Sequence, residues 1–93
     1  MLETKFKEKV IADLKTLPEC WWIKTMERGR NGTPDLLICL SGKFIAIELK
    51  REKGIVTPLQ AHTLKKITMA RGLAFDTTPS AWADHFATLK SLA

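Results

Sequence analysis

A two-residue break between two apolar segments constrains the fold of this chain more than any other feature of its sequence. Residues 35–40 and residues 43–50 are rich in branched apolar side chains, and only Ser41 and Gly42 separate them. A two-residue loop that contains a glycine, which tolerates a positive φ angle, predicts a tight β-hairpin. Because the loop is so short, the pairing register of the two strands follows from counting away from the turn.

The register of this hairpin brings two carboxylates together. Counting from the turn places Asp35 directly opposite Glu48, so both side chains point to one face of the sheet, with Cβ atoms ~4.5–5.5 Å apart. Like charges in that arrangement destabilise a sheet. A hard divalent cation such as Mg²⁺ reverses the effect, because it takes carboxylate oxygens as ligands and keeps waters on its other positions. The register therefore predicts a metal site.

Lys50 adds a third group to this face. It lies two residues after Glu48, and alternate residues of a strand project to the same side. A metal held by carboxylates polarises a phosphoryl oxygen and lowers the pKa of a bound water, and a neighbouring ammonium group orients that water or stabilises developing negative charge. We interpret Asp35, Glu48 and Lys50 as a minimal hydrolytic unit.

Patterns of apolar residues and of turn residues predict the elements around the hairpin. Thr57-Pro58-Leu59-Gln60 is a strong helix start of the capping-box type, and Gly72 is expected to end that helix. The expected elements are a helix over 3–17, strands over 19–26, 35–40 and 43–50, a helix over 57–71, a strand over 73–77 and a helix over 79–92. The order αβββαβα predicts one α/β domain with a central mixed four-stranded sheet flanked by helices.

The first of these helices carries an acid on its apolar side. Phe6, Val10 and Leu14 recur at helical spacing, and Glu3 falls at the centre of their stripe, whereas Glu8 falls about 140° away. We expect Glu3 to supply a further metal ligand, directly or through water. The alternative is that Glu3 only stabilises the helix N-terminus through the macrodipole.

Together these motifs resemble the PD-(D/E)XK nuclease superfamily and, more narrowly, its virus-type replication-repair nuclease domain, VRR-Nuc. The matching motifs are Gly-Thr-Pro-Asp at 32–35, Phe-Ile-Ala-Ile-Glu-Leu-Lys at 44–50 and Thr-Pro-Leu-Gln at 57–60, followed by Gly72. The resemblance covers roughly residues 3–77 and leaves the helix over 79–92 outside. It implies a restriction-endonuclease-like fold and a single VRR-Nuc nuclease domain over residues 1–93.

The resemblance also implies roles for the residues of the hairpin. Asp35, Glu48 and the main-chain carbonyl of Leu49 are expected to bind Mg²⁺ or Mn²⁺. Lys50 is expected to be catalytic. Two of these residues come from one strand and one from its neighbour, so the hairpin itself would hold the metal.

Residues outside the hairpin match the family pattern too. Glu3 and Lys24 lie where the family has an acidic helix residue and a strand lysine, so Glu3 joins the expected catalytic set. Gln60 joins it as well, supporting the site from the start of its helix. The capping box alone also explains Gln60, so a purely structural role stays open.

The charge balance indicates an anionic partner. The 93 residues include 15 Lys and Arg against 10 Asp and Glu, which gives a net charge of +5. Basic residues flank the expected site, in the loop before Asp35 and in the loop after Lys50. We expect contacts with DNA phosphates from Lys24, Arg28, Arg30, Arg51 and Lys53.

Several other classes of protein are excluded. No apolar run approaches the ~20 residues needed to span a bilayer, so no membrane partner is expected. Cys20 and Cys39 are the two cysteines and form no CxxC pair, which argues against a zinc site and a disulfide scaffold. The N-terminal residues lack the layout of a signal peptide. We expect an intracellular, cytoplasmic protein encoded by a bacterium or a phage.

These observations predict a Mg²⁺- or Mn²⁺-dependent endodeoxyribonuclease that cuts structured DNA, above all four-way branches of the Holliday-junction type. We expect a homodimer, because adjacent Trp21 and Trp22 point to opposite faces of a strand, and Trp82, Phe86 and Leu89 form a stripe that one small core need not bury. The alternatives are a flap- or end-directed repair nuclease and a non-catalytic basic nucleic-acid-binding module. The last explains the net charge but not the paired carboxylates.

Overall fold

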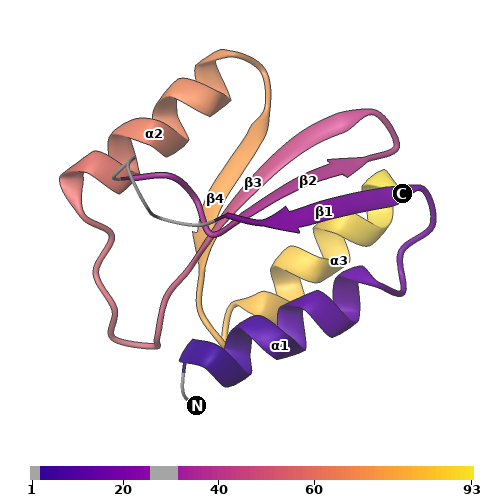
Figure 1. The fold of residues 1–93 in the computed structure, drawn as a ribbon, viewed down its shortest axis with the longest axis horizontal. Coiled ribbons are helices and arrows are strands. Elements are labelled where there is room, and N and C mark those ends of the chain that lie inside the picture. Colours follow the sequence, from indigo (N-terminus) through magenta and orange to yellow (C-terminus); the bar gives the residue numbers. More distant parts are fainter. Residues whose placement is uncertain (1–2, 26–31) are drawn as a thin grey trace.

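The structure, a computed structural model, describes residues 3–25 and 32–93. In this part of the chain the elements follow the order αβββαβα (Figure 1). They are α1 (Glu3–Leu14), β1 (Cys20–Lys24), β2 (Leu36–Leu40), β3 (Lys43–Leu49), α2 (Pro58–Met69), β4 (Leu73–Thr77) and α3 (Trp82–Leu92). The expected order is confirmed. Within the described ranges, no helix is long and apolar enough to cross a membrane.

The first helix ends earlier than its apolar pattern predicts. Leu17 lies on the expected stripe, but the helix ends at Leu14. Beyond that point the chain tightens into three-residue turns, because the Thr16 N–H donates to the Asp13 carbonyl and the Leu17 N–H to the Leu14 carbonyl. Pro18 follows and has no N–H to donate. The proline therefore ends the helical segment, as expected, and the last turn is lost with it.

The four strands form one mixed sheet in the order β1-β2-β3-β4. β1 pairs with β2 and β2 with β3 in antiparallel fashion, whereas β3 and β4 are parallel. A parallel pair needs a crossover, and α2 supplies it. The crossover explains why α2 begins at the end of the sheet where β3 stops. The predicted fold class, a mixed four-stranded sheet flanked by helices, is confirmed.

The hairpin between β2 and β3 has the predicted register. Every ladder pair joins the residues that counting from the turn predicts, out to Leu36 and Ile47. Ser41 and Gly42 both have positive φ angles, 50° and 84°. Positive φ at both central positions is the mark of a type I′ turn, whose twist matches that of the flanking strands. Asp35 is the next residue beyond the last ladder pair.

Helices cover both faces of the sheet. α1 and α3 lie on one face and α2 on the other (Figure 1). The main core lies under α1 and α3 and consists of Phe6, Val10, Leu14, Leu36, Ile38, Leu40, Ile45, Ile47, Leu49, Trp82 and Leu89. The alternate residues Ala46 and Glu48 point to the α2 face and are buried as well. Of the two inner strands, β3 is therefore buried on both faces from Ile45 to Leu49.

The last helix belongs to this core, which corrects one expectation. Trp82 and Leu89 are buried, and Phe86 packs against the core with its ring stacked on Trp82. The predicted stripe on this helix is therefore core and does not form an exposed surface. The stripe faces α1 and the sheet because an amphipathic helix this close to an uncovered sheet face gains most by burying its apolar side there.

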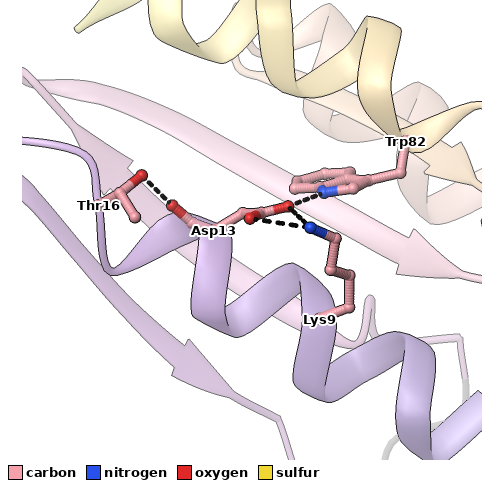
Figure 2. Close-up of polar contacts among 4 residues, drawn as sticks. All are labelled: Lys9, Asp13, Thr16 and Trp82. Atoms are coloured by element: carbon pink, nitrogen blue, oxygen red, sulfur yellow. Dashed lines mark hydrogen bonds and ion pairs between the residues drawn. The ribbon is translucent and has the colours of Figure 1, made fainter.

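A polar contact links α3 to α1 (Figure 2). The Trp82 indole Nε1–H donates to Asp13 Oδ2 at 2.7 Å, and the Lys9 ammonium lies 3.3 Å from the same carboxylate. Thr16 Oγ1 donates to the Asp13 main-chain carbonyl at 2.7 Å. A buried indole usually finds such a partner. Asp13 therefore joins the two helices on this side of the sheet.

Candidate active site

The predicted site residues lie at one end of the sheet. Asp35 immediately precedes β2, Glu48 and Leu49 end β3, and Lys50 follows. α2 begins at this end because it is the crossover between parallel strands. Figure 1 shows that α1 also begins on this side of the molecule. The hydrogen bond of Gln60 with Glu48 places the start of α2 at the end of the hairpin that carries the acids.

Asp35 is held by hydrogen bonds from both neighbouring strands. The residue is 8% exposed. Its Oδ2 accepts a hydrogen bond from the Leu49 main-chain N–H at 2.7 Å. Its main-chain carbonyl accepts from the Thr25 N–H at 3.0 Å and from the Thr25 hydroxyl at 3.2 Å. The Asp35 carboxylate thus replaces the main-chain acceptor that the next ladder pair would supply, and its orientation is fixed.

Glu48 is the most buried acid of the site, at 2% exposure. Its Oε1 accepts a hydrogen bond from Gln60 Nε2 at 3.2 Å. Gln60 Oε1 in turn accepts from the Thr57 N–H at 2.9 Å, and the Gln60 N–H donates to the Thr57 hydroxyl at 3.2 Å. The capping box is confirmed. The two roles left open for Gln60 are compatible, because its carbonyl oxygen caps the helix while its amino group binds Glu48.

The main chain at the end of β3 is also fixed in direction. The Leu49 N–H donates to Asp35, which lies on the side of β3 that faces β2. N–H and C=O of one strand residue face the same neighbouring strand, so the Leu49 carbonyl lies toward that side too. The Lys50 N–H donates to the Thr77 carbonyl of β4 at 2.9 Å. Lys50 is half-buried, directly after two main-chain anchors.

The donor set fits a hard divalent cation. Asp35 and Glu48 are buried carboxylates on neighbouring strands, and within residues 3–25 and 32–93 no lysine or arginine forms an ion pair with Asp35. Buried charges need compensation by a partner or a metal. No group of three or more His, Cys, Asp or Glu side chains that could hold a metal occurs in the same part of the chain. A cation here would therefore take two carboxylates, main-chain oxygen and water, which is a set that Mg²⁺ accepts.

Glu3 is not brought into direct contact with this pair. It is the first residue of α1 and is exposed. α1 packs on the sheet face opposite to α2, whereas Glu48 points to the α2 face. With no three-carboxylate group among the described residues, direct coordination by Glu3 together with both acids is not seen.

The basic residues expected to contact DNA divide into two groups. Arg28 and Arg30 lie outside the described residues. Lys24 is exposed at the last position of β1, and Arg51 and Lys53 are exposed in the loop that follows Lys50. The described cations are thus at the same end of the sheet as the paired acids.

Two features of this region were missed by the sequence analysis. Asp76 is the parallel neighbour of Glu48 and is exposed on the same face of the sheet. Glu52 accepts hydrogen bonds from Ser80, which lies in the turn before α3. No short turn fixes the register of a parallel pair, so the only available signal was an acid near the end of the strand expected over 73–77.

Comparison with known proteins supports the architecture. No family model matches the sequence, and no curated protein matches it. A solved structure described as a VRR_NUC domain is similar over 97% of this chain and 91% of its own, with a TM-score of 0.73 and 22% sequence identity. The chain has the VRR_NUC fold. The expected resemblance is confirmed at the level of the fold, which is restriction-endonuclease-like.

The structural match to the VRR_NUC domain extends further than the sequence motifs do. The motifs ended before the helix expected over 79–92. A match over 97% of the chain leaves fewer residues unmatched than α3 contains, so α3 is part of the shared architecture. This agrees with the burial of Trp82 and Leu89 in the main core.

Proposed function

We propose that this chain is a metal-dependent nuclease that hydrolyses phosphodiester bonds in DNA. One observation carries the proposal. Asp35 and Glu48 are buried carboxylates on adjacent strands at one end of a VRR_NUC fold, with Lys50 directly after them. Burying two like charges side by side is costly unless a cation binds both.

Each residue of the site has a defined task in this proposal. A bound Mg²⁺ or Mn²⁺ supplies Lewis acidity toward a phosphoryl oxygen and lowers the pKa of a water ligand. Asp35 and Glu48 hold the cation, joined by the Leu49 carbonyl. The Lys50 ammonium stabilises the negative charge that develops on the phosphoryl group or orients the attacking water. Gln60 keeps Glu48 Oε1 in place through its hydrogen bond.

The nuclease activity is tested by incubating supercoiled, linear and four-way-junction DNA with the protein, with Mg²⁺, with Mn²⁺ and with EDTA. We expect metal-dependent cleavage by the wild type. Lys50→Ala should lower kcat by about 10²-fold, because it removes charge stabilisation used in the transition state. Lys65→Ala, an exposed lysine on α2, is the matched control and should cut normally. Normal turnover by Lys50→Ala would contradict the proposal.

Glu3 enters the proposal through a water-mediated contact at the start of α1. Glu3→Gln and Glu8→Gln form a matched pair, because both acids are exposed on α1 but lie on different sides of the helix. Loss of activity in the first variant alone supports the contact. Equal activity of the two variants would remove Glu3 from the site.

DNA binding in this proposal depends on phosphate contacts. Lys24, Arg51 and Lys53 are exposed at the end of the sheet that carries the acids. Affinity should fall with salt by about −0.9 in the log–log slope for each neutralised phosphate of duplex DNA. A non-catalytic DNA-binding module would share this salt dependence, but it would not cut DNA with any metal.

The proposal extends to a homodimer that cuts four-way junctions with paired nicks. α2 covers β4 and the end of β3, and leaves large apolar side chains of β1 and of the start of β3 exposed on the same face. Trp21 is 64% exposed, Ile23 46% and Phe44 46%. An exposed apolar patch is typical of an interface. A two-fold dimer would present two identical sites to a junction that is itself nearly two-fold symmetric.

Cleavage products separate the candidate substrates. Symmetric paired nicks in a four-way junction support the junction proposal. Cleavage of flaps or free ends without junction nicking would instead support the flap- or end-directed repair nuclease.

A further inference from the structure

The loop between β3 and α2 holds an acid among its cations. Residues 50–53 read Lys-Arg-Glu-Lys, and Glu52 is the third of them. Glu52 Oε1 accepts a hydrogen bond from the Ser80 N–H at 3.0 Å and another from the Ser80 hydroxyl at 3.0 Å. Ser80 is 28 residues away, in the turn between β4 and α3. The side chain therefore bridges two segments that are distant in sequence.

The loop has further anchors on either side of Glu52. The Lys50 N–H donates to the Thr77 carbonyl at 2.9 Å, which ties the start of the loop to β4. The Gly54 N–H donates to the Arg51 carbonyl at 2.8 Å and closes a tight turn. A Cβ atom at Gly54 would lie 3.1–3.2 Å from main-chain atoms of Arg51. Among these anchors, only the contact of Glu52 holds the tip of the turn to another part of the molecule.

The charge of Glu52 makes its direction important. A carboxylate between Lys50, Arg51 and Lys53 would repel DNA phosphates if it pointed the same way as the cations. The two donors of Ser80 hold the carboxylate against the turn before α3. These hydrogen bonds, first the main-chain one and then the side-chain one, also lower the pKa of Glu52 below its ordinary value. The Glu52 carboxylate that makes this contact is therefore ionised at neutral pH.

We propose that Glu52 is a positioning residue of the nuclease site, whose carboxylate, held by Ser80, fixes the loop so that Arg51 and Lys53 meet the DNA backbone. This inference rests on the proposed function, because it assigns the two cations to DNA phosphates. Without this contact the loop and its cations would sample many conformations. Ordering them on binding DNA would then cost conformational entropy, which weakens binding relative to the native, already ordered loop. Lys50 keeps its main-chain bond to Thr77 in either case.

Loss of the Glu52 anchor and loss of the Glu52 charge predict opposite changes in DNA affinity. Glu52→Ala removes a negative charge from a surface that binds a polyanion, so charge alone predicts tighter binding of DNA. It also removes the acceptor of both Ser80 hydrogen bonds. Loss of the anchor predicts weaker binding. Ser80→Ala removes one donor without changing any charge, so it should also weaken binding. Glu8→Ala is the charge-matched control, because it removes an exposed acid on the polar side of α1.

The test is fluorescence anisotropy with a labelled four-way junction in EDTA, followed by steady-state cleavage in Mg²⁺. We expect Glu52→Ala and Ser80→Ala each to raise Kd and KM about threefold to tenfold, with kcat within about twofold of the wild type. The double variant should bind DNA no more weakly than the weaker-binding single variant, because both changes act on the same contact. Thermal unfolding identifies any variant that has lost its fold, and Ser80→Ala then carries the test.

Unchanged or tighter DNA binding by Glu52→Ala together with unchanged binding by Ser80→Ala would overturn the inference. Anisotropy in EDTA does not depend on cleavage. If the wild type cuts DNA and the variants bind as it does, only the role of Glu52 fails. If the variants bind weakly but the wild type cuts no DNA, the positioning role stands and the nuclease proposal fails.

Discussion

Asp35 combines a structural bond with its proposed role as a metal ligand. Its Oδ2 accepts the Leu49 N–H at 2.7 Å, in a position where only 8% of the residue is exposed. The hairpin register alone predicts that removing this charge relieves repulsion with Glu48. The hydrogen bond adds a cost to the same change whenever the new residue cannot accept. The choice of substitution therefore decides the outcome.

Asp35→Asn and Asp35→Ala should accordingly differ in stability when no metal is present. Asn keeps an oxygen acceptor for the Leu49 N–H and removes the negative charge, so we expect a free energy of unfolding close to that of the wild type. Ala leaves a buried N–H without its partner, which costs about 1–3 kcal/mol. Urea unfolding in EDTA measures both values. Equal stability of the two variants would show that the hydrogen bond contributes nothing.

The two cysteines should differ in reactivity. Cys20 is half-buried on the core side of β1, and burial, with a smaller contribution from Cys39, raises the pKa of its thiol. Cys39 is exposed on the other face of the sheet. The thiolate is the reactive form, so a raised pKa lowers the reactive fraction of Cys20 near pH 8. Cys39 lies between Trp21 and Phe44 on the proposed dimer interface, so the labelling is done on the interface variant Trp21→Ser/Ile23→Thr. Iodoacetamide labelling followed by mass spectrometry should modify Cys39 first, and faster labelling of Cys20 would contradict the assigned faces.

The paired acids could be predicted from the sequence, but their partners could not. Ser41 and Gly42 fix the register locally, so counting from the turn was enough to find Asp35 and Glu48. The contact of Asp35 with the Leu49 N–H depends on how the chain leaves the ladder. The contact of Glu52 with Ser80 and the position of Asp76 beside Glu48 depend on the packing of β4 against β3. No local pattern encodes that packing.

At the scale of the elements, the chain after α2 has a glycine at a position where close packing leaves no room for a side chain. Gly72 was expected to end the helix. The helix ends at Met69, and Arg71 takes the left-handed conformation, with φ of 74°. The Gly72 N–H closes the cap on the Ile67 carbonyl at 3.0 Å. A Cβ atom at Gly72 would lie 2.8 Å from Ile67 Cγ2 and 3.1 Å from Phe44, so close packing requires the glycine.

The contact between α1 and α3 is predicted to be energetically coupled. Trp82→Phe removes the indole donor and Asp13→Ala removes its acceptor, a bond of 2.7 Å. A hydrogen bond to a charged group contributes about 1.5–3 kcal/mol to stability. Solvent reaches the Asp13 carboxylate on the side of the exposed Lys9, so the contribution of this bond should be at the lower end. We expect a coupling of about 1–2 kcal/mol in a double-mutant cycle of urea unfolding. A coupling near zero would mean that Asp13 does not join the two helices.

At the scale of the whole molecule, the uncovered half of one sheet face is the main departure from a closed globule. The apolar stripe on α3, which the core was not expected to need in full, is buried, whereas Trp21 on β1 is exposed. The strand alternation that places Trp21 and Trp22 on opposite faces could be read from the sequence. Which face a helix would cover could not, because it depends on where the crossover of α2 settles.

This apolar surface should hold two copies of the chain together. Trp21→Ser combined with Ile23→Thr removes large apolar area from it, so we expect the mass to fall from about twice 10.5 kDa to that of one chain. Light scattering at low micromolar concentration gives the mass. Met69→Ser, which changes a residue 73% exposed on α2, is the matched control and should stay dimeric. A wild-type monomer would contradict the interface.

The central claim is that Asp35 and Glu48 together hold a divalent cation. Calorimetric titration of Mn²⁺ into the wild type, Asp35→Asn, Glu48→Gln and the control Glu8→Gln tests it most directly. We predict saturable binding by the wild type and by Glu8→Gln, and binding weakened by about tenfold or more, a loss of at least about 1.4 kcal/mol, in the other two. Wild-type affinity in both Asp35→Asn and Glu48→Gln would contradict the account.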